Sequence, residues 1–370
     1  MINSFPGYEF VRGSDGKFHN MYRGTDLGFG GYVYAEPGMY SNVALLDVGN
    51  MHGASIIALN KFGEHTKRYE EIREARMAIK ARDYERVNKM LDGKLSPYLT
   101  SDEEADKMQA ALKLILNSTY GIAAATFDNP LRDPRDKNNI IALRGALFMR
   151  TLQDEVVKRD FQVVHIKTDS IKIPNATKEI IDFCIKFGET YGYEFEHEAT
   201  YDRMCLVNDA VYIAKYDSHG VRNKGGKHAN EWTATGTQFQ VPYVFKTLFS
   251  HEPIEFKDKC ETKTVTSALY LDMNEGLPEN EHDYQFVGKA GSFCPIKPGC
   301  GGGLLMREKD GKYNAATGTK GYRWLESEMV QNLNKEKDID LSYYNHLVDE
   351  AIQSISTYGD AEWFIHSEEN

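Results

Sequence analysis

A single helical face that carries a cation, an amide and an aromatic ring constrains this chain more than any other feature. The pattern of residues 102–120 predicts one long helix. Within the segment K-x-x-x-N-S-x-Y-G, Lys113, Asn117 and Tyr120 are spaced i, i+4 and i+7 and therefore lie on one helical face. Such a face suits a triphosphate and a base pair. The structural alternative is a surface stripe on a helix that Gly121 ends as its C′ residue.

Two aspartates lie where predicted strands end. Asp47 directly follows the apolar run 43–46, which predicts a strand buried on both faces, an environment that normally excludes an acid. Asp169 lies at the predicted tip of a hairpin between strands 162–166 and 171–173. Each aspartate also has a structural interpretation, Asp47 as the N-cap of a following helix and Asp169 as an ordinary turn residue.

The remaining pattern predicts a mixture of helices and strands without internal repeats. Ser101 and Glu104 form a capping-box signature, and the helix before them makes an antiparallel hairpin with the one after. The first 31 residues and the region after residue 231 look irregular and loop-rich. We expect strands over 32–37, 43–48 and 204–215, helices over 66–91, 139–158, 177–191, 324–333 and 343–358, and a hairpin turn at Asp310-Gly311.

Length and composition are those of an ordinary globular protein. The 370 residues suffice for two or three compact modules, and 41% hydrophobic with 27% charged residues is a typical balance. No apolar run approaches the roughly 20 residues of a membrane span, and the N-terminus lacks the regions of a signal peptide. Five cysteines in a chain of this length do not indicate a disulfide framework, so we expect a reducing cytoplasm.

The net charge of −11 at first opposes binding to nucleic acid, because phosphate contacts need Lys and Arg. The charge is unevenly distributed, however. Residues 326–370 hold 11 acidic and 2 basic side chains, whereas residues 61–90 hold 9 basic and 6 acidic side chains. Since the acid is concentrated in a tail, another surface of the molecule can still face DNA.

The order of these features resembles motifs A, B and C of family B DNA polymerases, most closely the phage enzymes. The likeness begins near Gly30 and reaches the C-terminal region. It implies an α+β fold with a right-hand architecture: an antiparallel-sheet palm, helical-hairpin fingers and a mixed α/β thumb. The implied boundaries are 1–58 for the first part of the palm, 59–128 for the fingers, 129–235 for the second part of the palm, and 236–370 for the thumb and acidic tail.

The resemblance implies a DNA-templated DNA polymerase that extends a primer 3′-hydroxyl with dNTPs and releases pyrophosphate in phage or viral replication, in the host cytoplasm. Asp47 and Asp169, with the Val48 carbonyl, would hold two Mg²⁺ ions, for which Mn²⁺ can substitute. Two carboxylates about 4 Å apart repel by roughly 4 kcal/mol at an effective dielectric of 20. Without metal, one of them should therefore protonate more readily.

The resemblance also implies residues that bind the incoming nucleotide. Lys113 matches the family's triphosphate lysine. Arg76 looks like the arginine of the facing helix, with Arg73 and Arg68 as competitors, while Lys80 is as well explained by a solvated helix face. The residues implied for dNTP binding are Lys113, Arg76, Asn117, Tyr120, Met51 and His52.

The residues implied for the primer and template are Thr168, Ser170, Tyr212, Gly121 and Lys215. The segment from Val207 to Lys215 resembles the family's primer-holding Lys-x-Tyr segment, in which Tyr212 matches the tyrosine. Ala210 stands where the lysine is expected, and Lys215 is the candidate that could compensate. In the implied thumb, the plausible phosphate contacts are Lys297, Lys309, Lys312, Lys320 and Arg323.

Several positions depart from the family's pattern. Asn50, His52 and Gly53 replace residues of the usual Ser-Leu-Tyr-Pro-Ser sequence, so the turn should be looser and sugar selection altered. Lys167 replaces the first aspartate of Asp-Thr-Asp, and this nearby cation should favour the ionised form of Asp169.

The resemblance also leaves questions of partners and metals. Because motif A begins at Asp47, we expect no proofreading exonuclease in this chain. The partners besides primer–template DNA and dNTPs would be a separately encoded 3′-5′ exonuclease or an N-terminal polymerase fragment. Cys294, Cys300 and His282 fit no common structural zinc pattern.

Three alternatives stay open at this point. The chain could be a catalytically weak, DNA-binding accessory protein derived from a polymerase core, which the altered motif A favours and the two retained aspartates disfavour. It could be one piece of a split polymerase. It could also be another palm-domain nucleotidyltransferase such as a primase-polymerase, against which the K-x-x-x-N-S-x-Y-G helix argues.

Overall fold

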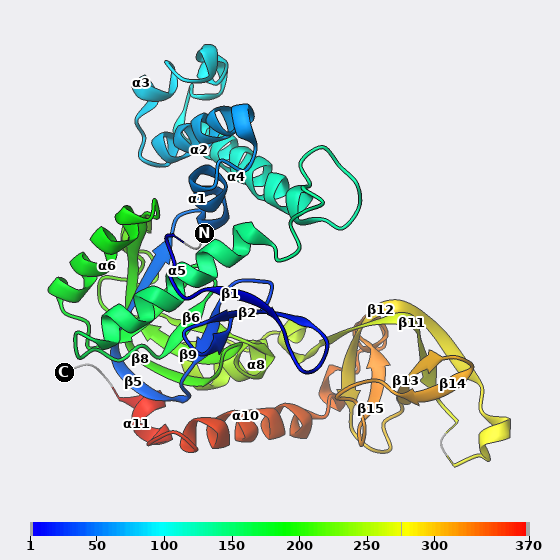
Figure 1. The fold of residues 1–370 in the computed structure, drawn as a ribbon. Helices are drawn as coiled ribbons and strands as arrows, with labels where there is room; N and C mark the ends of the chain where they lie inside the picture. The colour runs from blue at the N-terminus through cyan, green and yellow to red at the C-terminus, as the bar shows by residue number, and fades with distance from the viewer. Residues whose placement is uncertain (1–2, 275, 368–370) are drawn as a thin grey trace. The chain divides into compact units, whose positions relative to one another are not determined.

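The computed structural model describes residues 3–274 and 276–367, which divide into two compact units (Figure 1). The first unit comprises Met1–Met204 and Tyr216–Asn230, and the second comprises Cys205–Lys215 and Glu231–Asn370. Both units combine helices with antiparallel sheets, so the expected mixed α and β class is confirmed.

Five strands of the first unit lie side by side in the order β8-β5-β7-β6-β4. The strands are β4 (Val33–Ala35), β5 (Gly38–Val48), β6 (His165–Lys167), β7 (Ser170–Pro174) and β8 (Phe195–Asn208). The expected strand that contains Asp47 at its end and the two strands on either side of Asp169 are thereby confirmed. β4 pairs with β6 and β5 pairs with β7, both antiparallel, so the Pro37-Gly38 turn joins strands that are not hairpin partners.

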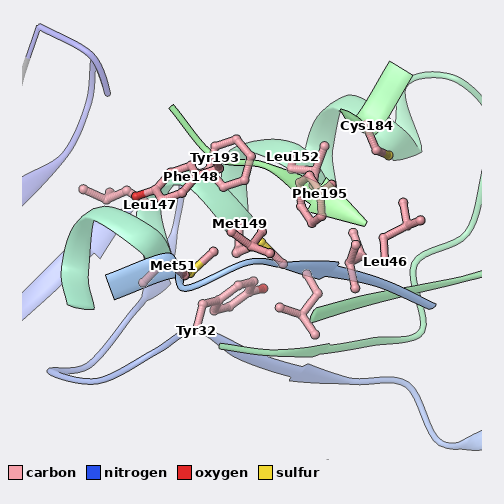
Figure 2. Close-up of a cluster of buried hydrophobic side chains, with 14 of the residues drawn as sticks. Tyr32, Leu46, Met51, Leu147, Phe148, Met149, Leu152, Cys184, Tyr193 and Phe195 are labelled. Atoms are coloured by element: carbon pink, nitrogen blue, oxygen red, sulfur yellow. The ribbon is translucent and has the colours of Figure 1, made fainter. Parts of the chain in front are cut away.

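One face of this sheet packs against two helices, α5 (Ile140–Val157) and α6 (Lys178–Thr190), both close to their expected bounds. Side chains alternate along a strand, so Leu46 and Val48 enter this core while Asp47 faces away from the two helices. Figure 2 shows the centre of the core, which includes Leu46, Leu147, Phe148, Leu152, Cys184 and Phe195. The core thus fixes the strand that ends in Asp47.

The helix expected over 66–91 is broken in the structure, so that prediction was wrong. α2 spans Thr66–Lys80, and a short α3 follows at Tyr84–Val87. Between them Arg82 has a φ of 61°, and Asp83 accepts a backbone hydrogen bond that caps α3. Asp favours caps over helix interiors, because its side chain competes for backbone N–H groups.

The helix α4 (Asp102–Ala124) is the one predicted from the Lys-Asn-Tyr face. The Ser101 hydroxyl caps its start by accepting from the Glu104 N–H at 3.2 Å. The helix continues beyond Gly121, so this glycine is not the C′ residue. α4 packs along α2, and both contact α1 (Met51–Ala58), which directly follows the Asp47 strand (Figure 1).

The N-terminal region, which looked irregular, contains a three-stranded sheet. Its strands are β1 (Glu9–Arg12), β2 (Phe18–Tyr22) and β3 (Thr25–Asp26), in that order. The strands are short and separated by turns rich in Gly and Asp, so no alternation is long enough to be recognised in the sequence.

The hairpin that carries Asp169 has a strained tip. Thr168 has a φ of 56°, which is rare for a β-branched residue, and its N–H donates to the Tyr32 carbonyl at 2.9 Å. A Cβ at Gly31 would lie 2.4 Å from the Thr168 hydroxyl oxygen. A glycine is therefore needed at position 31 to let the two backbones approach.

The second unit contains more strand than expected. Residues 204–215 are not one strand: β8 ends at Asn208, whose side chain accepts from the Ala210 N–H at 2.8 Å, and β9 (Val211–Tyr216) begins after the turn. β9 pairs antiparallel with β10 (Trp232–Thr235). The turn depends on an asparagine side chain, a local signal that the apolar run concealed.

The region after residue 231 forms a five-stranded antiparallel sheet in the order β14-β13-β11-β12-β15. Its strands are β11 (Glu261–Asp272), β12 (Tyr284–Ile296), β13 (Leu304–Lys309), β14 (Lys312–Ala315) and β15 (Arg323–Glu326). The expectation of loops was wrong here, since a register shift in β11 interrupts the alternation that would reveal it. The hairpin turn at Asp310-Gly311 is confirmed between β13 and β14.

The second unit also contains helices, which follow β10 and β15 in the chain. The segment expected as a helix over 324–333 is β15 followed by a short α9, whereas the helix expected over 343–358 is confirmed as α10. The helices are α7 (Thr237–Gln240), α8 (Pro242–Phe245), a π-helical turn (Lys246–Ser250), α9 (Ser327–Asn332), α10 (Leu341–Ser356) and α11 (Ala361–His366). Among the described residues, no helix is long and apolar enough to cross a membrane.

The contact between Gly31 and the hairpin tip predicts the effect of adding one methyl group. Gly31→Ala should lower the free energy of unfolding by about 1–3 kcal/mol, because the tip must shift to admit the Cβ. Gly30→Ala is the matched control, since a Cβ there meets nothing within 4 Å, and should change it by less than about 0.5 kcal/mol. Urea unfolding of both variants measures the difference; equal stabilities would contradict the packing described.

Candidate active site

A polar hollow in the first unit brings together six of the predicted site residues, including both aspartates. It is bounded by the end of β5, the β6–β7 tip, the start of β8, the facing sides of α2 and α4, and a loop near residue 223. The lining residues are Asp47, Val48, Gly49, Asn50, Arg76, Met77, Lys80, Gln109, Lys113, Asn117, Asp169, Glu196, Glu198, Asn223 and Lys224.

The two predicted aspartates meet at the end of the sheet. In the β5–β7 ladder Asp47 lies opposite Ser170, so it is next to Asp169 across the strands. The Val48 N–H donates to the Asp169 carbonyl at 2.8 Å, which joins the two chain segments at this point. Residues far apart in the sequence are thus held by backbone pairing, and their carboxylates both line the hollow.

Burial and mutual repulsion leave the two carboxylates poorly stabilised. Burial, followed by the negative charges of Asp169, Glu198 and Glu196, raises the pKa of Asp47 to about 7. Burial also raises the pKa of Asp169, and Glu198 adds to this. One carboxylate of the pair protonates more readily without a cation, as the sequence led us to expect.

The sequence interpretation missed two acids of this site. Glu196 and Glu198 lie on β8 and alternate with the buried Phe195, so both point to the same face as Asp47. The Glu196 carboxylate is engaged, because it accepts from Lys80 at 2.8 Å and from the Asn223 amide at 2.7 Å. The signal was the alternation in Y-E-F-E-H-E, where every second residue is acidic.

A buried lysine, rather than Lys167, supplies positive charge beside the acids. Lys172 lies opposite Leu45 on β7, and its ammonium group is 2.9 Å from His165 Nδ1. Burial lowers the pKa of Lys172 to about 8, while the charges of Asp47 and Glu198 act to raise it. Burial outweighs the nearby cations at Asp169, whose pKa is raised although Lys172 acts to lower it, so the expected effect of Lys167 stays a prediction.

Three of the candidate cations on α2 are held by protein groups. The buried guanidinium of Arg73 donates to the Gly49 carbonyl at 3.1 Å and lies 3.6 Å from Glu194. Arg68 pairs with Glu71 on the exposed side of the helix. Lys80, as noted, is bound to Glu196, so it is neither free nor merely solvated.

Of the candidate cations named from the sequence, Arg76 and Lys113 remain available to a ligand. Both line the hollow, from α2 and α4 respectively. Arg76 is half-buried; burial and then the neighbouring Arg73 lower its pKa, and its Nε has no hydrogen-bond partner among the described residues. Within that same part of the chain neither side chain forms an ion pair. The geometry therefore favours Arg76 over Arg73 and Arg68 as the second cation.

The turn after Asp47 is held by the side chain of Asn50. Asn50, with a φ of 50°, caps α1 by accepting from the Gly53 N–H at 3.2 Å, so Asp47 is not the cap. A Cβ at position 53 would lie 2.4 Å from the Asn50 amide, so Gly53 and Asn50 fit each other. Met51 is buried in the core against Gly145, which places its side chain outside the hollow.

The aromatic part of the predicted nucleotide site is preformed. The rings of His52 and Tyr120 stack with centroids 4.0 Å apart and an angle of 14°. Burial lowers the pKa of His52, so the ring is neutral near pH 7. The Asn139 amide lies 3.4 Å from the Tyr120 hydroxyl, while Asn117 is exposed on the same helix and lines the hollow.

The residues predicted to hold primer and template lie in both units. Thr168 and Ser170 flank Asp169, and Gly121 is exposed on α4. Tyr212 and Lys215 lie on β9 of the second unit, where the Lys215 ammonium is 6.0 Å from the Trp232 ring centroid. Of the expected thumb lysines, Lys297 is bound to the Lys337 carbonyl at 2.8 Å.

No group of three or more His, Cys, Asp or Glu side chains arranged to hold a metal ion occurs within residues 3–274 and 276–367. The imidazole Nδ1 of His282 lies 2.8 Å from the Asp272 carboxylate. All five cysteines are free thiols, with Cys260 and Cys294 3.6 Å apart.

Comparisons with known proteins connect the chain to polymerases. No family model matches it. A stretch of 164 residues, 43% of the chain, is 26% identical to DNA polymerase 1 of Sulfolobus acidocaldarius, and the chain covers only 18% of that relative's length. The structure of the family B DNA polymerase from the hyperthermophilic archaeon Pyrobaculum calidifontis matches with a TM-score of 0.48 at 12% identity, over 96% of this chain and 49% of that one. In sequence, the chain is similar at low identity to an archaeal DNA polymerase over less than half of its length.

Proposed function

We propose that the chain is the polymerising core of a family B, phage-type DNA polymerase, which extends a primer 3′-hydroxyl with dNTPs and releases pyrophosphate. The observation that carries the proposal is the hollow in which Asp47 and Asp169 lie with Arg76 and Lys113. Carboxylates on one side and unpaired cations on the other are what metal-assisted transfer of a nucleotide from a triphosphate requires.

The carboxylate end of the hollow fits divalent cations. Its donors are hard oxygens, and burial, followed by the negative charges of Asp169, Glu198 and Glu196, raises the pKa of Asp47. Asp47 and Asp169, with the Val48 carbonyl, would hold two Mg²⁺ or Mn²⁺ ions, and Glu198 adds a third carboxylate nearby. When bound, such ions stabilise charge on the attacking and leaving oxygens of phosphoryl transfer.

The opposite side of the hollow fits the rest of the nucleotide. Arg76 and Lys113 would bind the triphosphate, because both reach the hollow without an acid partner. Asn117 and Tyr120 would line the nascent base pair. His52, stacked on Tyr120, would lie under the sugar and contribute to the exclusion of a 2′-hydroxyl.

The domain division of a right-hand polymerase extends this proposal to the whole chain. The antiparallel sheet in 1–58 and 129–235 would be the palm, and α2 with α4 in 59–128 the fingers. Residues 236–370 would be the thumb; Lys263, Arg307 and Lys309 line a hollow there that suits phosphates of the duplex. The substrates would be primer–template DNA and dNTPs in phage replication, with proofreading from a separate exonuclease or polymerase fragment.

Primer extension by Asp169→Asn tests the proposed activity. We expect nucleotide incorporation to fall by at least about 10³-fold, because the substitution removes a carboxylate from the reacting site while keeping its size. Asp349→Asn, an exposed position on α10, is the control and should extend primers normally. Native activity in a folded Asp169→Asn protein would refute the site.

The cations that line the hollow should differ in their effect on the apparent KM for dNTP, depending on whether a protein group already binds them. Arg76→Ala and Lys113→Ala should each raise the apparent KM for dNTP by about 10- to 100-fold, since each removes a positive charge that would bind the triphosphate. Lys80→Ala should have a smaller effect, because its ammonium group is bound to Glu196. Single-nucleotide incorporation kinetics measure this order, with exposed Lys89→Ala as the control. An equal rise in the apparent KM for Lys89→Ala would contradict the roles assigned to Arg76 and Lys113.

The raised pKa of Asp47 predicts how metal-free stability depends on pH. The folded protein keeps this proton up to about pH 7, whereas the unfolded chain loses it near pH 4. The folded state therefore binds more protons in between, so the contribution is complete below about pH 4 and is lost as pH rises to 7. In EDTA, Asp47→Asn should raise the free energy of unfolding at pH 8 by about 2 kcal/mol, after allowance for solvent screening.

Chemical unfolding of the native protein and Asp47→Asn at pH 5 and pH 8 measures this contribution. The difference between the two proteins should be larger at pH 8, and added Mg²⁺ should stabilise only the native protein appreciably. A difference that is the same at both pH values would show that the pKa of Asp47 is not raised in the folded protein.

A further inference from the structure

Three phenylalanine rings form an apolar hollow on the N-terminal sheet, apart from the polar hollow described above. Phe10 and Phe18 stack with centroids 4.9 Å apart, and Phe29 meets Phe10 edge-on at 6.3 Å. Phe18 is 50% exposed and Phe29 is 45% exposed, and all three line one cavity with Lys17 and Lys137. We call this set of three rings the phenylalanine hollow.

The phenylalanine hollow is not part of the protein's core. None of its rings belongs to the buried cluster of the first unit or to the partly buried side chains packed against it. Keeping large rings in water is unfavourable, and a contiguous exposed apolar surface usually marks a binding site. Within the stacked pair, Phe18 is the more exposed ring and is accessible to a ligand.

The charge around the phenylalanine hollow is positive. Lys17 and Lys137 line it, and neither forms an ion pair within the described residues. The two neighbouring acids are both engaged by one histidine, since His19 Nδ1 lies 2.6 Å from Asp26 and Nε2 lies 3.0 Å from Asp15. A ligand of the hollow should therefore combine flat apolar groups with negative charge.

A single side chain connects this hollow to the candidate active site. The Asn139 amide donates to the Phe29 carbonyl at 3.0 Å and lies 3.4 Å from the Tyr120 hydroxyl. Tyr120 belongs to the helix that carries Lys113 and Asn117. Asn139 therefore contacts both the phenylalanine hollow, through Phe29, and the proposed base-pair site, through Tyr120.

We propose that the phenylalanine hollow binds an unpaired base of the single-stranded template next to the active site. Aromatic rings that stack on bases, flanked by cations that meet phosphates, form the usual site for single-stranded nucleic acid. The inference rests on the proposed function, because it takes the ligand to be the template overhang. It assigns base stacking to Phe18 and phosphate contact to Lys17 and Lys137.

Binding to an overhang with and without bases tests the proposal. The probe is a fluorescent primer–template duplex with a four-thymidine 5′ overhang, compared with the same duplex carrying abasic sites in the overhang. The full chain, measured by anisotropy without dNTP or divalent metal, should bind the abasic duplex about tenfold more weakly, because stacking is lost. Phe18→Ala should bind the thymidine duplex about tenfold more weakly and no longer distinguish the two.

Two further variants make the result specific. Phe18→Tyr keeps a stacking ring and should retain the difference, and Phe286→Ala, which removes an even more exposed ring of the second unit, should also retain it. Native protein that binds both duplexes equally, or Phe18→Ala that still prefers bases, would overturn the proposal. Because the assay involves no incorporation, such a failure would leave primer extension intact, whereas failure of the proposed function would appear as an absence of extension.

Discussion

Negative charge that the polypeptide does not fully neutralise is the constraint on which the candidate active site depends. Asp47, Asp169 and Glu198 converge on the sheet face turned away from α5 and α6, and their repulsion, added to burial, holds the pKa of Asp47 near 7. Lys172 is the buried counter-charge, yet burial lowers its own pKa. Such a cluster persists because the apolar core on the other face keeps the strands in register. The unfavourable charge is thereby held in place by the fold.

The rest of the first unit positions groups around that charge. The strained Thr168 turn, accommodated by Gly31, fixes the hairpin that carries Asp169. Arg73 joins α2 to the turn after β5 through the Gly49 carbonyl, and so leaves Arg76 as the cation that faces the hollow. Departures from the family's pattern are matched within the structure, since Asn50 requires the small residue at position 53.

Much of this site could be predicted from the sequence, because its strongest signals are local. The spacing of Lys113, Asn117 and Tyr120 on one helix needs no tertiary information, and an acid after an apolar strand is visible directly. The roles of Glu198 and Lys172 could not be predicted in this way, since they depend on which strands become neighbours. The break at Asp83 and the long strands after residue 260 were missed because a capping side chain and a register shift outweighed the apparent periodicity.

The most direct test of the account is a crystal structure of the protein with Mn²⁺, primer–template DNA and a non-hydrolysable dNTP analogue, in which anomalous scattering locates the metal. The account predicts Mn²⁺ bound by the carboxylates of both Asp47 and Asp169, with the triphosphate between the ions and the side chains of Arg76 and Lys113. A bound nucleotide with no Mn²⁺ at either aspartate, or with its triphosphate held elsewhere, would contradict it.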